Sequence, residues 1–185
     1  ERLLTDAVYD RVTGLPNRAL FLDRLSRLLA GHEGQAAPDT YVLLVDIDRF
    51  KVVNDALGHE VGDSLLNIIG RRLLAEAGPG DTVARLPGDQ FAILYCDPTG
   101  ERDIQAFTEG IRKAAARPIM LEPQEVFLTA SIGVANHREA GLGADQLMKD
   151  AAIALYEAKR RGSDTIEVFD TSMRDDRAEL VVLES

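Results

Sequence analysis

The sequence has one cysteine, Cys96, no tryptophan, and no apolar run long enough to cross a bilayer. A single cysteine excludes an intramolecular disulfide framework. The missing apolar run argues against direct membrane contact in this fragment. Residues 1–6 also lack the pattern of a signal peptide. We therefore expect a reducing, cytoplasmic setting.

Basic residues are also few. The 21 Lys and Arg side chains stand against 31 Asp and Glu, which gives a formal charge of -10. Such a balance argues against nucleic acid as a partner, because a nucleic-acid surface needs clustered Lys and Arg. A nucleotide ligand remains compatible, since a metal ion and a few local donors are enough to hold its phosphates.

The pattern of apolar residues predicts one globular domain in which helices and strands alternate. A hairpin interrupts the alternation, which favours a sandwich with an antiparallel-containing sheet over a purely doubly wound fold. The expected strands are residues 41–47, 82–86, 91–95, 126–135 and 165–169. The first expected helix lies around residues 22–29 and ends at Gly31. The others are residues 51–57, 63–77, 104–116 and 145–161.

Acidic residues stand at the ends of two expected strands. Asp46 and Asp48 end the strand at 41–47, and Asp89 lies in the hairpin turn. Buried carboxylates need a partner, and Mg²⁺ typically takes one or two of them together with phosphate oxygens. If the hairpin lies beside the strand, Asp89 approaches Asp46 and forms a metal pocket, where Gly88 lets a phosphate or ribose come close. A solvated strand end and a turn-forming Asp are the alternatives.

Three further polar residues allow two interpretations each. An amide and a carboxylate, Asn54 and Asp63, match the hydrogen-bonding edge of guanine, but Asn54 also suits a helix surface and Asp63 a helix N-cap. Lys159 is either a phosphate ligand or a cation favoured at a helix C-terminus.

Six segments, taken in order, resemble the GGDEF domain, the fold of diguanylate cyclases. They span residues 10 to 169 nearly continuously: DRVTGLPNR (10–18), DIDRFKVVND (46–55), GHEVGD (58–63), RLPGDQF (85–91), SIGVA (131–135) and ALYEAK (154–159).

The resemblance implies a central, mostly antiparallel sheet flanked by helices, similar to nucleotidyl cyclases and polymerase palms. Active members condense two GTP into cyclic di-GMP across a dimer. Carried over by position, the resemblance implies that Mg²⁺ is held by Asp46, the Ile47 carbonyl and Asp89, and that Asp46 and Asp89 are the catalytic residues. It also implies a set of GTP-binding residues: Asn54, Asp63, Phe50, Gly88 and Lys159.

The sequence departs from the family at the signature turn. Pro87 replaces the first Gly and lacks an N–H, and Gln90 replaces an acid and cannot act as an anionic ligand. Ser163 stands where the family has a phosphate-binding Arg. The inhibitory R-x-x-D motif keeps Asp81 but has Gly78 in place of Arg.

These departures predict a degenerate GGDEF domain that binds GTP with Mg²⁺ and regulates a neighbour. An active cyclase and a ligand-free dimerisation module are the alternatives. Residues 1–9 resemble the end of a signalling helix, 10–170 the GGDEF domain, and 171–185 a connector to a downstream domain such as EAL. We expect a homodimer in the full protein.

Overall fold

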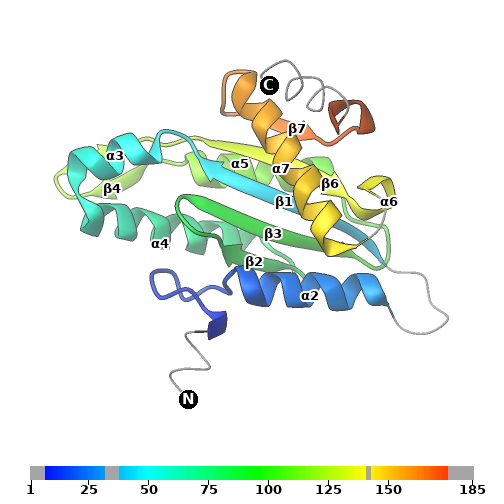
Figure 1. The fold of residues 1–185 in the computed structure, drawn as a ribbon. Helices are drawn as coiled ribbons and strands as arrows, with labels where there is room; N and C mark the ends of the chain where they lie inside the picture. The colour runs from blue at the N-terminus through cyan, green and yellow to red at the C-terminus, as the bar shows by residue number, and fades with distance from the viewer. Residues whose placement is uncertain (1–6, 32–37, 141–142, 175–185) are drawn as a thin grey trace, which may run out of the picture.

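The computed structural model describes residues 7–31, 38–140 and 143–174. Figure 1 shows a central sheet with helices packed along it. The helices are α2 (Arg18–Ala30), α3 (Phe50–Leu57), α4 (His59–Glu76), α5 (Ile104–Ala116), α6 (His137–Ala140) and α7 (Ala144–Arg160), and the strands are β1 (Asp39–Ile47), β2 (Thr82–Arg85), β3 (Gln90–Asp97), β4 (Ile119–Leu121), β5 (Gln124–Val126), β6 (Ala130–Asn136) and β7 (Ile166–Val168).

The main sheet has the strand order β2-β3-β1-β6-β7. Strand β1 lies in the middle, antiparallel to both β3 and β6, and β2 pairs antiparallel with β3. Only the β6–β7 pair is parallel among the described strands. The expected fold class, a mostly antiparallel sheet flanked by helices, is confirmed.

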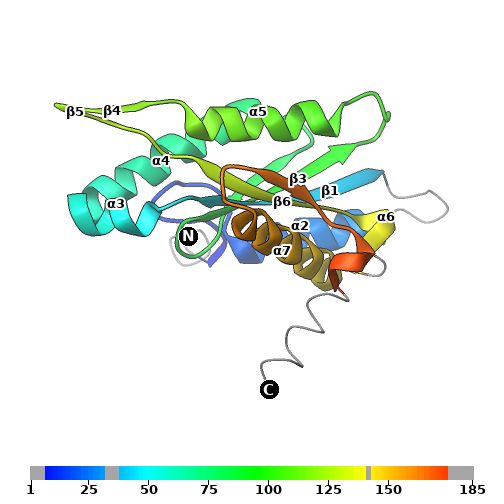
Figure 2. The ribbon, with the colours of Figure 1, turned by 90° about the horizontal axis from the view of Figure 1, so that it is seen from above.

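Two hydrophobic layers cover the two faces of this sheet. One contains Leu43, Val45 and Ile47 of β1 and packs against α4 and α5. The other contains Val42 and Leu44 and packs against α2 and α7. Alternate residues of β1 point to opposite faces, as strand geometry requires. Figure 2 shows α4 and α5 on one side of the sheet and α2 and α7 on the other.

Helix α7 lies very close to β6. A side chain at Gly133 would place its Cβ 2.3 Å from the Ala151 carbonyl oxygen and from the Leu155 backbone nitrogen. Only glycine fits there, because the atoms in the way belong to the helix backbone. This close contact fixes α7, and with it Lys159, relative to the sheet.

Several expected boundaries were wrong. Helix α4 begins at His59 and not at Asp63, because Gly58 (φ 94°) ends α3 and starts α4 by itself. The N-cap interpretation of Asp63 is therefore wrong. The single strand expected at residues 126–135 is two strands, since Val126 pairs with Ile119 in a separate hairpin and β6 starts at Ala130.

Other expectations agree with the structure. Gly31 ends α2 with φ 66°, and α5 has the predicted bounds. Of the expected signalling helix at residues 1–9, residues 1–6 lie outside the described part. So do residues 175–185 of the expected connector. No helix in the described ranges is long and apolar enough to span a membrane.

Candidate functional site

The end of β1 brings three predicted site residues together. The Asp46 carboxylate is 4% exposed, and its Oδ2 lies 2.6 Å from Lys159 Nζ of α7. Gln90 Nε2, at the start of β3, donates to the same Oδ2 at 3.1 Å. Asp46 and Gln90 are register partners in the β1–β3 ladder, so the sheet itself holds the two side chains side by side.

Asp89 completes this cluster from the turn between β2 and β3. Its carbonyl accepts a hydrogen bond from the Ile47 N–H at 3.1 Å, which ties the turn to the end of β1. Burial, together with the nearby Asp46 carboxylate, raises the pKa of Asp89, and Lys159 and Arg85 partly oppose that rise. The Asp89 carboxyl group is therefore near enough to Asp46 for their charges to interact, which agrees with the expectation that the hairpin brings Asp89 toward Asp46.

Asp48 has a different role from Asp46. Its carboxylate accepts hydrogen bonds from Thr129 Oγ1 at 2.7 Å, Ser131 Oγ at 2.6 Å and the Asp164 N–H at 3.0 Å. Both oxygens are occupied by protein donors, so the charge is already satisfied. The interpretation of Asp48 as half of a metal pair is not supported by this geometry.

The predicted base-reading residues lie at the corner between α3 and α4. A Cβ at Gly62 would come within 2.0 Å of Asn54 Oδ1, so the Asn54 side chain lies directly over the residue before Asp63. Asn54 Nδ2 also lies 3.1 Å from His59 Nδ1. Asp63 is exposed, and it lines a cavity of about 670 Å³. Gly62 and His59 were not selected from the sequence, although both belong to the GHEVGD segment.

Phe50 lies beneath this corner and is 8% exposed. Its ring tip would be 3.3 Å from a Cβ at Gly62. The side chain belongs to the core on the α4 side of the sheet. Its predicted contact with GTP stays a prediction.

The altered signature forms the turn of the β2–β3 hairpin, as predicted. The Leu86 N–H donates to the Gln90 carbonyl at 2.9 Å, and Gly88 adopts φ 83° with open space around its Cα. Pro87 and Gly88 are exposed at the tip. The hairpin therefore forms with proline in place of the first glycine.

Arg85 connects this turn to the N-terminal segment. Its Nη1 contacts Asp10 Oδ1 at 2.9 Å, and its Nη2 donates to the Gly88 carbonyl at 2.7 Å. Asp10 Oδ2 also accepts from the Thr13 N–H and Oγ1, both at 2.8 Å. Burial favours a higher pKa for Asp10, but the hydrogen bonds from Thr13 and the pairing with Arg85 outweigh it and lower that pKa.

The turn after α7 carries Ser163 in place of the family arginine. Ser163 and Asp164 have positive φ values of 64° and 47°. The two neighbouring arginines already have acidic partners: Arg160 pairs with Glu157, and Arg161 pairs with Glu157 and Glu167. These pairs compete with any use of Arg160 or Arg161 on a phosphate.

The remaining Asp of the R-x-x-D motif is bound within the protein. The Asp81 side chain is fully buried. Arg102 Nη1 and Nη2 contact its two oxygens at 2.8 and 2.7 Å. The Arg102 guanidinium stacks on Tyr95, with its Cζ 4.1 Å from the ring centroid. With its carboxylate enclosed in this way, Asp81 has no free face for a ligand.

The Asp46–Asp89 cluster suits Mg²⁺ that arrives with a nucleotide better than a stand-alone ion. No group of three or more His, Cys, Asp or Glu side chains that could hold a metal occurs in the described ranges. One or two carboxylates are enough for Mg²⁺ when phosphates supply further oxygens. Burial and, after it, the Asp46 carboxylate raise the pKa of Asp89, and a bound cation would lower that pKa again.

Comparisons with known proteins identify the family to which this fold belongs. The family model described as "Diguanylate cyclase, GGDEF domain" matches residues 7–165. The chain is 37% identical to the bifunctional diguanylate cyclase/cyclic di-GMP phosphodiesterase MucR of Pseudomonas aeruginosa, over 92% of this chain and 25% of MucR. It is 40% identical to the diguanylate cyclase TpbB of the same species, over 87% of this chain and 38% of TpbB.

Solved structures show the same fold. The GGDEF domain of Pseudomonas aeruginosa TpbB superposes with a TM-score of 0.85 at 34% identity, covering 92% of this chain and 99% of that one. An EAL/GGDEF domain protein from M. capsulatus gives a TM-score of 0.70 at 37% identity, covering 84% and 99%. The chain spans about a quarter or less of the first curated relatives it matches. On these matches, the chain belongs to the GGDEF domain family of diguanylate cyclases.

Proposed function

We propose that this domain binds GTP with Mg²⁺ and regulates an adjoining domain in cyclic di-GMP signalling, while its own turnover is weak or absent. The observation that carries the proposal is the hydrogen bond from Gln90 Nε2 to Asp46 Oδ2. The family has an acid at position 90, whereas this chain has an amide that donates to a neighbouring acid. The site has lost a negative charge where phosphoryl transfer needs metal ions.

Binding depends on residues that the altered turn leaves in place. Asp46 and Asp89 would hold Mg²⁺ together with the Ile47 carbonyl, and Mg²⁺ would neutralise the phosphates. Lys159 would move from Asp46 Oδ2 onto a phosphate. Asn54 and Asp63 lie outside the turn, at the α3–α4 corner, and would bind the guanine edge.

Loss of one anionic group costs turnover more than binding. Removing a charge that acts in the transition state commonly costs a hundredfold or more, roughly 3 kcal/mol. Relatives named as bifunctional proteins or phosphodiesterases support a partner domain, and we propose an EAL domain after this one. We further propose a homodimer in the full protein and a cytoplasmic location, where GTP is supplied.

The second candidate is an active diguanylate cyclase. The retention of Asp46, Asp89 and Lys159 in one cluster favours it, because two carboxylates and a lysine are the groups that Mg²⁺ and phosphates need. It requires the Pro87 turn to admit the nucleotide as the family's glycine does.

Calorimetric titration with GTP and Mg²⁺, followed by a product assay with labelled GTP, separates the candidates. We expect micromolar binding that Asn54→Ala and Asp63→Ala weaken, and little or no cyclic di-GMP. Product at ordinary cyclase rates would establish the second candidate. A lack of binding would leave a ligand-free dimerisation module.

A double reversion tests whether the turn is the cause. We expect Pro87→Gly with Gln90→Glu to raise turnover while GTP affinity stays within a few-fold. If binding is intact and the double variant stays silent, the defect lies outside the turn, with Ser163 as the next residue to change.

A further inference from the structure

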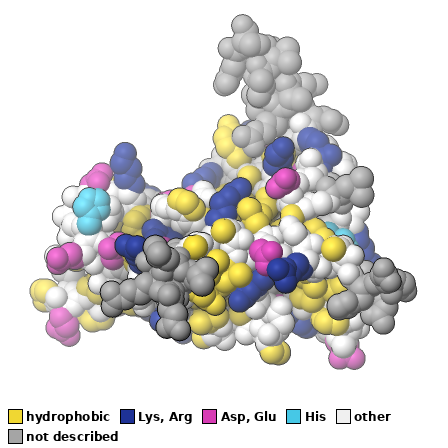
Figure 3. Space-filling model, turned by 60° about the horizontal axis from the view of Figure 1, so that its bottom comes forward, with side chains coloured by type: hydrophobic (Ala, Val, Ile, Leu, Met, Phe, Trp, Pro, Cys, Tyr) yellow, Lys and Arg dark blue, Asp and Glu magenta, His cyan; other side chains and the backbone are white. Residues whose placement is uncertain are grey.

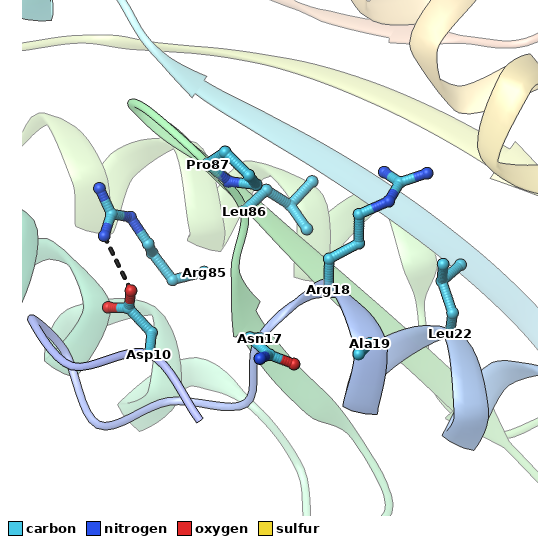
Figure 4. Close-up of a pocket in the computed structure, with 8 residues that line it drawn as sticks. All are labelled: Asp10, Asn17, Arg18, Ala19, Leu22, Arg85, Leu86 and Pro87. Carbon is cyan, nitrogen blue, oxygen red and sulfur yellow. Dashed lines mark hydrogen bonds and ion pairs between the residues drawn. The ribbon is translucent and has the colours of Figure 1, made fainter. Parts of the chain in front are cut away.

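Two cavities flank the signature turn on the sheet face that α2 and α7 cover. One, of about 510 Å³, is lined by Ala19, Leu22 and Pro87 among others (Figure 4). The other, of about 320 Å³, lies between α2 and α7 and is lined by Leu44, Gln90 and Lys149 among others. Arg18 and Leu86 line both. We call the two cavities together the Arg18 groove, and each altered signature residue lines one of its lobes.

The Arg18 groove contains two cations that have no partner among the residues the structure describes. Arg18, the first residue of α2, and Lys149 of α7 are both exposed and form no hydrogen bond or ion pair with any residue in the described ranges. Figure 4 shows the Arg18 side chain extending between Leu86 and Leu22. Figure 3 shows hydrophobic and basic side chains next to each other on the face that carries α2.

Most other polar groups of the groove are already engaged. Asp10 and Arg85 pair with each other. Asn17 caps α2 by accepting from the Leu20 N–H, and it donates to the Ala7 carbonyl. Asp145 is the one carboxylate in the smaller lobe, and the two cations outnumber it. A ligand therefore meets two free positive charges and an apolar wall, with few groups to read a nucleobase.

The groove borders the proposed GTP site at the signature turn and extends away from it. Lys149 precedes Lys159 by ten residues of α7, a helical rise of about 15 Å. The two sites share one residue, Gln90, which lines the groove and also donates to Asp46 Oδ2.

We propose that the Arg18 groove is a binding site for a small amphipathic anion. Its phosphate or carboxylate head would lie between Arg18 and Lys149, and its apolar body would pack against Leu22, Leu86 and Pro87. Charge-assisted hydrogen bonds would hold the head, and burial of apolar surface would hold the body. The smaller lobe has the size of a modest ligand pocket.

Phenyl phosphate is the probe that tests this site, because it carries both an anionic head and an apolar body. The chain has three methionines, so ¹³C-methyl labelling gives three signals. Met148 lines the groove, while Met120 lies on β4 in the separate hairpin and serves as an internal control. We expect phenyl phosphate to shift the Met148 signal saturably without shifting Met120, and to bind more tightly than inorganic phosphate or phenol alone.

Substitution of the two groove cations provides a second test of the site. We expect Arg18→Ala and Lys149→Ala each to weaken phenyl phosphate about fivefold or more, and Arg71→Ala on α4, across the sheet, to leave binding unchanged. Circular dichroism confirms that each variant is folded. An Arg18→Ala, Lys149→Ala double variant with wild-type affinity would overturn the proposal, as would an unmoved Met148 signal. The phenyl phosphate titration contains no GTP. Absence of phenyl phosphate binding is therefore distinguishable from absence of GTP binding.

Discussion

Gln90 differs from the family's acid by one group, an amide nitrogen in place of a carboxylate oxygen. In Gln90→Glu the donor to Asp46 is lost and a third carboxylate joins Asp46 and Asp89. We expect a lower melting temperature without Mg²⁺ and a larger stabilisation by Mg²⁺ than in the wild type. Thermal unfolding with and without Mg²⁺ measures both effects. Gln90→Met, which loses the donor without adding charge, is the control, and an equal Mg²⁺ response in the two variants would refute the expectation.

Asp89 gives a pH dependence with a definite sign. Its raised pKa means that the folded state binds the proton more tightly than the unfolded state. Protonation of Asp89 therefore stabilises the folded state, fully so below the pKa of an ordinary Asp. This stabilisation is lost as the pH rises through the raised pKa of the folded state. We expect Asp89→Asn to be more stable than wild type at pH 7.5, with the difference shrinking toward pH 4. Urea unfolding across this range measures it, with exposed Asp55→Asn as the control. A difference that is constant with pH would contradict the assignment.

At the scale of elements, the α3–α4 corner depends on a missing side chain. Gly62→Ala would place a methyl group where the Asn54 carboxamide now lies. Because the displaced group is the end of a flexible side chain, we expect the fold to persist while GTP affinity falls about tenfold, roughly the value of one lost hydrogen bond. Calorimetry tests this result. Gly110→Ala on α5, where the nearest atom is an ordinary 3.4 Å away, is the matched control, and equal GTP affinity in the two variants would count against a base-binding corner.

Asp48 directly follows β1 and accepts hydrogen bonds from Thr129 and Ser131 at the start of β6 and from Asp164 in the turn between α7 and β7. Asp48→Ala leaves two hydroxyls and one N–H without their acceptor, so we expect a loss of about 2–4 kcal/mol in the free energy of unfolding. Denaturant unfolding measures it. Asp48→Asn keeps one carbonyl oxygen and should lose less, and equal losses in the two variants would mean that the hydrogen bonds contribute little.

The elements themselves were largely predictable from local patterns. The run at residues 41–47 is apolar because β1 is buried on both faces, and α5 shows helical spacing with an Asp103 cap. The β4–β5 hairpin was missed because its strands have three residues each, too few for periodicity to show. The early start of α4 was missed because one glycine both ends α3 and begins α4.

At the scale of the whole molecule, the chain after β7 is fastened back onto α7. Arg174 Nη2 contacts both oxygens of Asp150, at 2.9 and 2.8 Å, and the Asp150 side chain is fully buried. Phe169 and Met173 join the core on the α7 side. We therefore propose that the folded unit continues to Arg174, beyond the boundary at residue 170 expected from sequence.

Arg174→Ala tests this boundary. It leaves Asp150 with Gln146 as its remaining partner in the described part of the chain. We expect the free energy of unfolding to fall by about 1–3 kcal/mol, less than for a fully buried pair, because the Arg174 side chain is 43% exposed. Urea unfolding measures it. We expect the double variant Arg174→Ala, Asp150→Asn to regain most of the free energy of unfolding that Arg174→Ala loses. If the losses of the two single variants simply add up in the double variant, the two side chains are not coupled.

The sequence predicted the site only where residues far apart in the chain are brought together by paired strands of the sheet. Asp89 lies near Asp46 because the hairpin pairs with β1, as expected from the sequence. The partners of Asp48 and Asp81 are up to 116 residues away along the chain, and no local pattern reveals them. The Arg18 groove was likewise invisible, since it is formed by residues of α2, α7 and the turn.

The bridge from Asp10 through Arg85 to Gly88 has a mechanical consequence. Tension applied to the backbone at Asp10 would reach the Gly88 peptide across two hydrogen bonds of 2.9 and 2.7 Å. The signature turn is therefore attached to the N-terminal segment by these side-chain hydrogen bonds, in addition to the backbone hydrogen bond from the Arg85 N–H to the Pro16 carbonyl at 2.9 Å. In a pulling experiment, Arg85→Ala should lower the force at which the N-terminal segment detaches, because the backbone hydrogen bond to Pro16 then remains there without the two side-chain hydrogen bonds, while the later force peaks from the sheet stay unchanged.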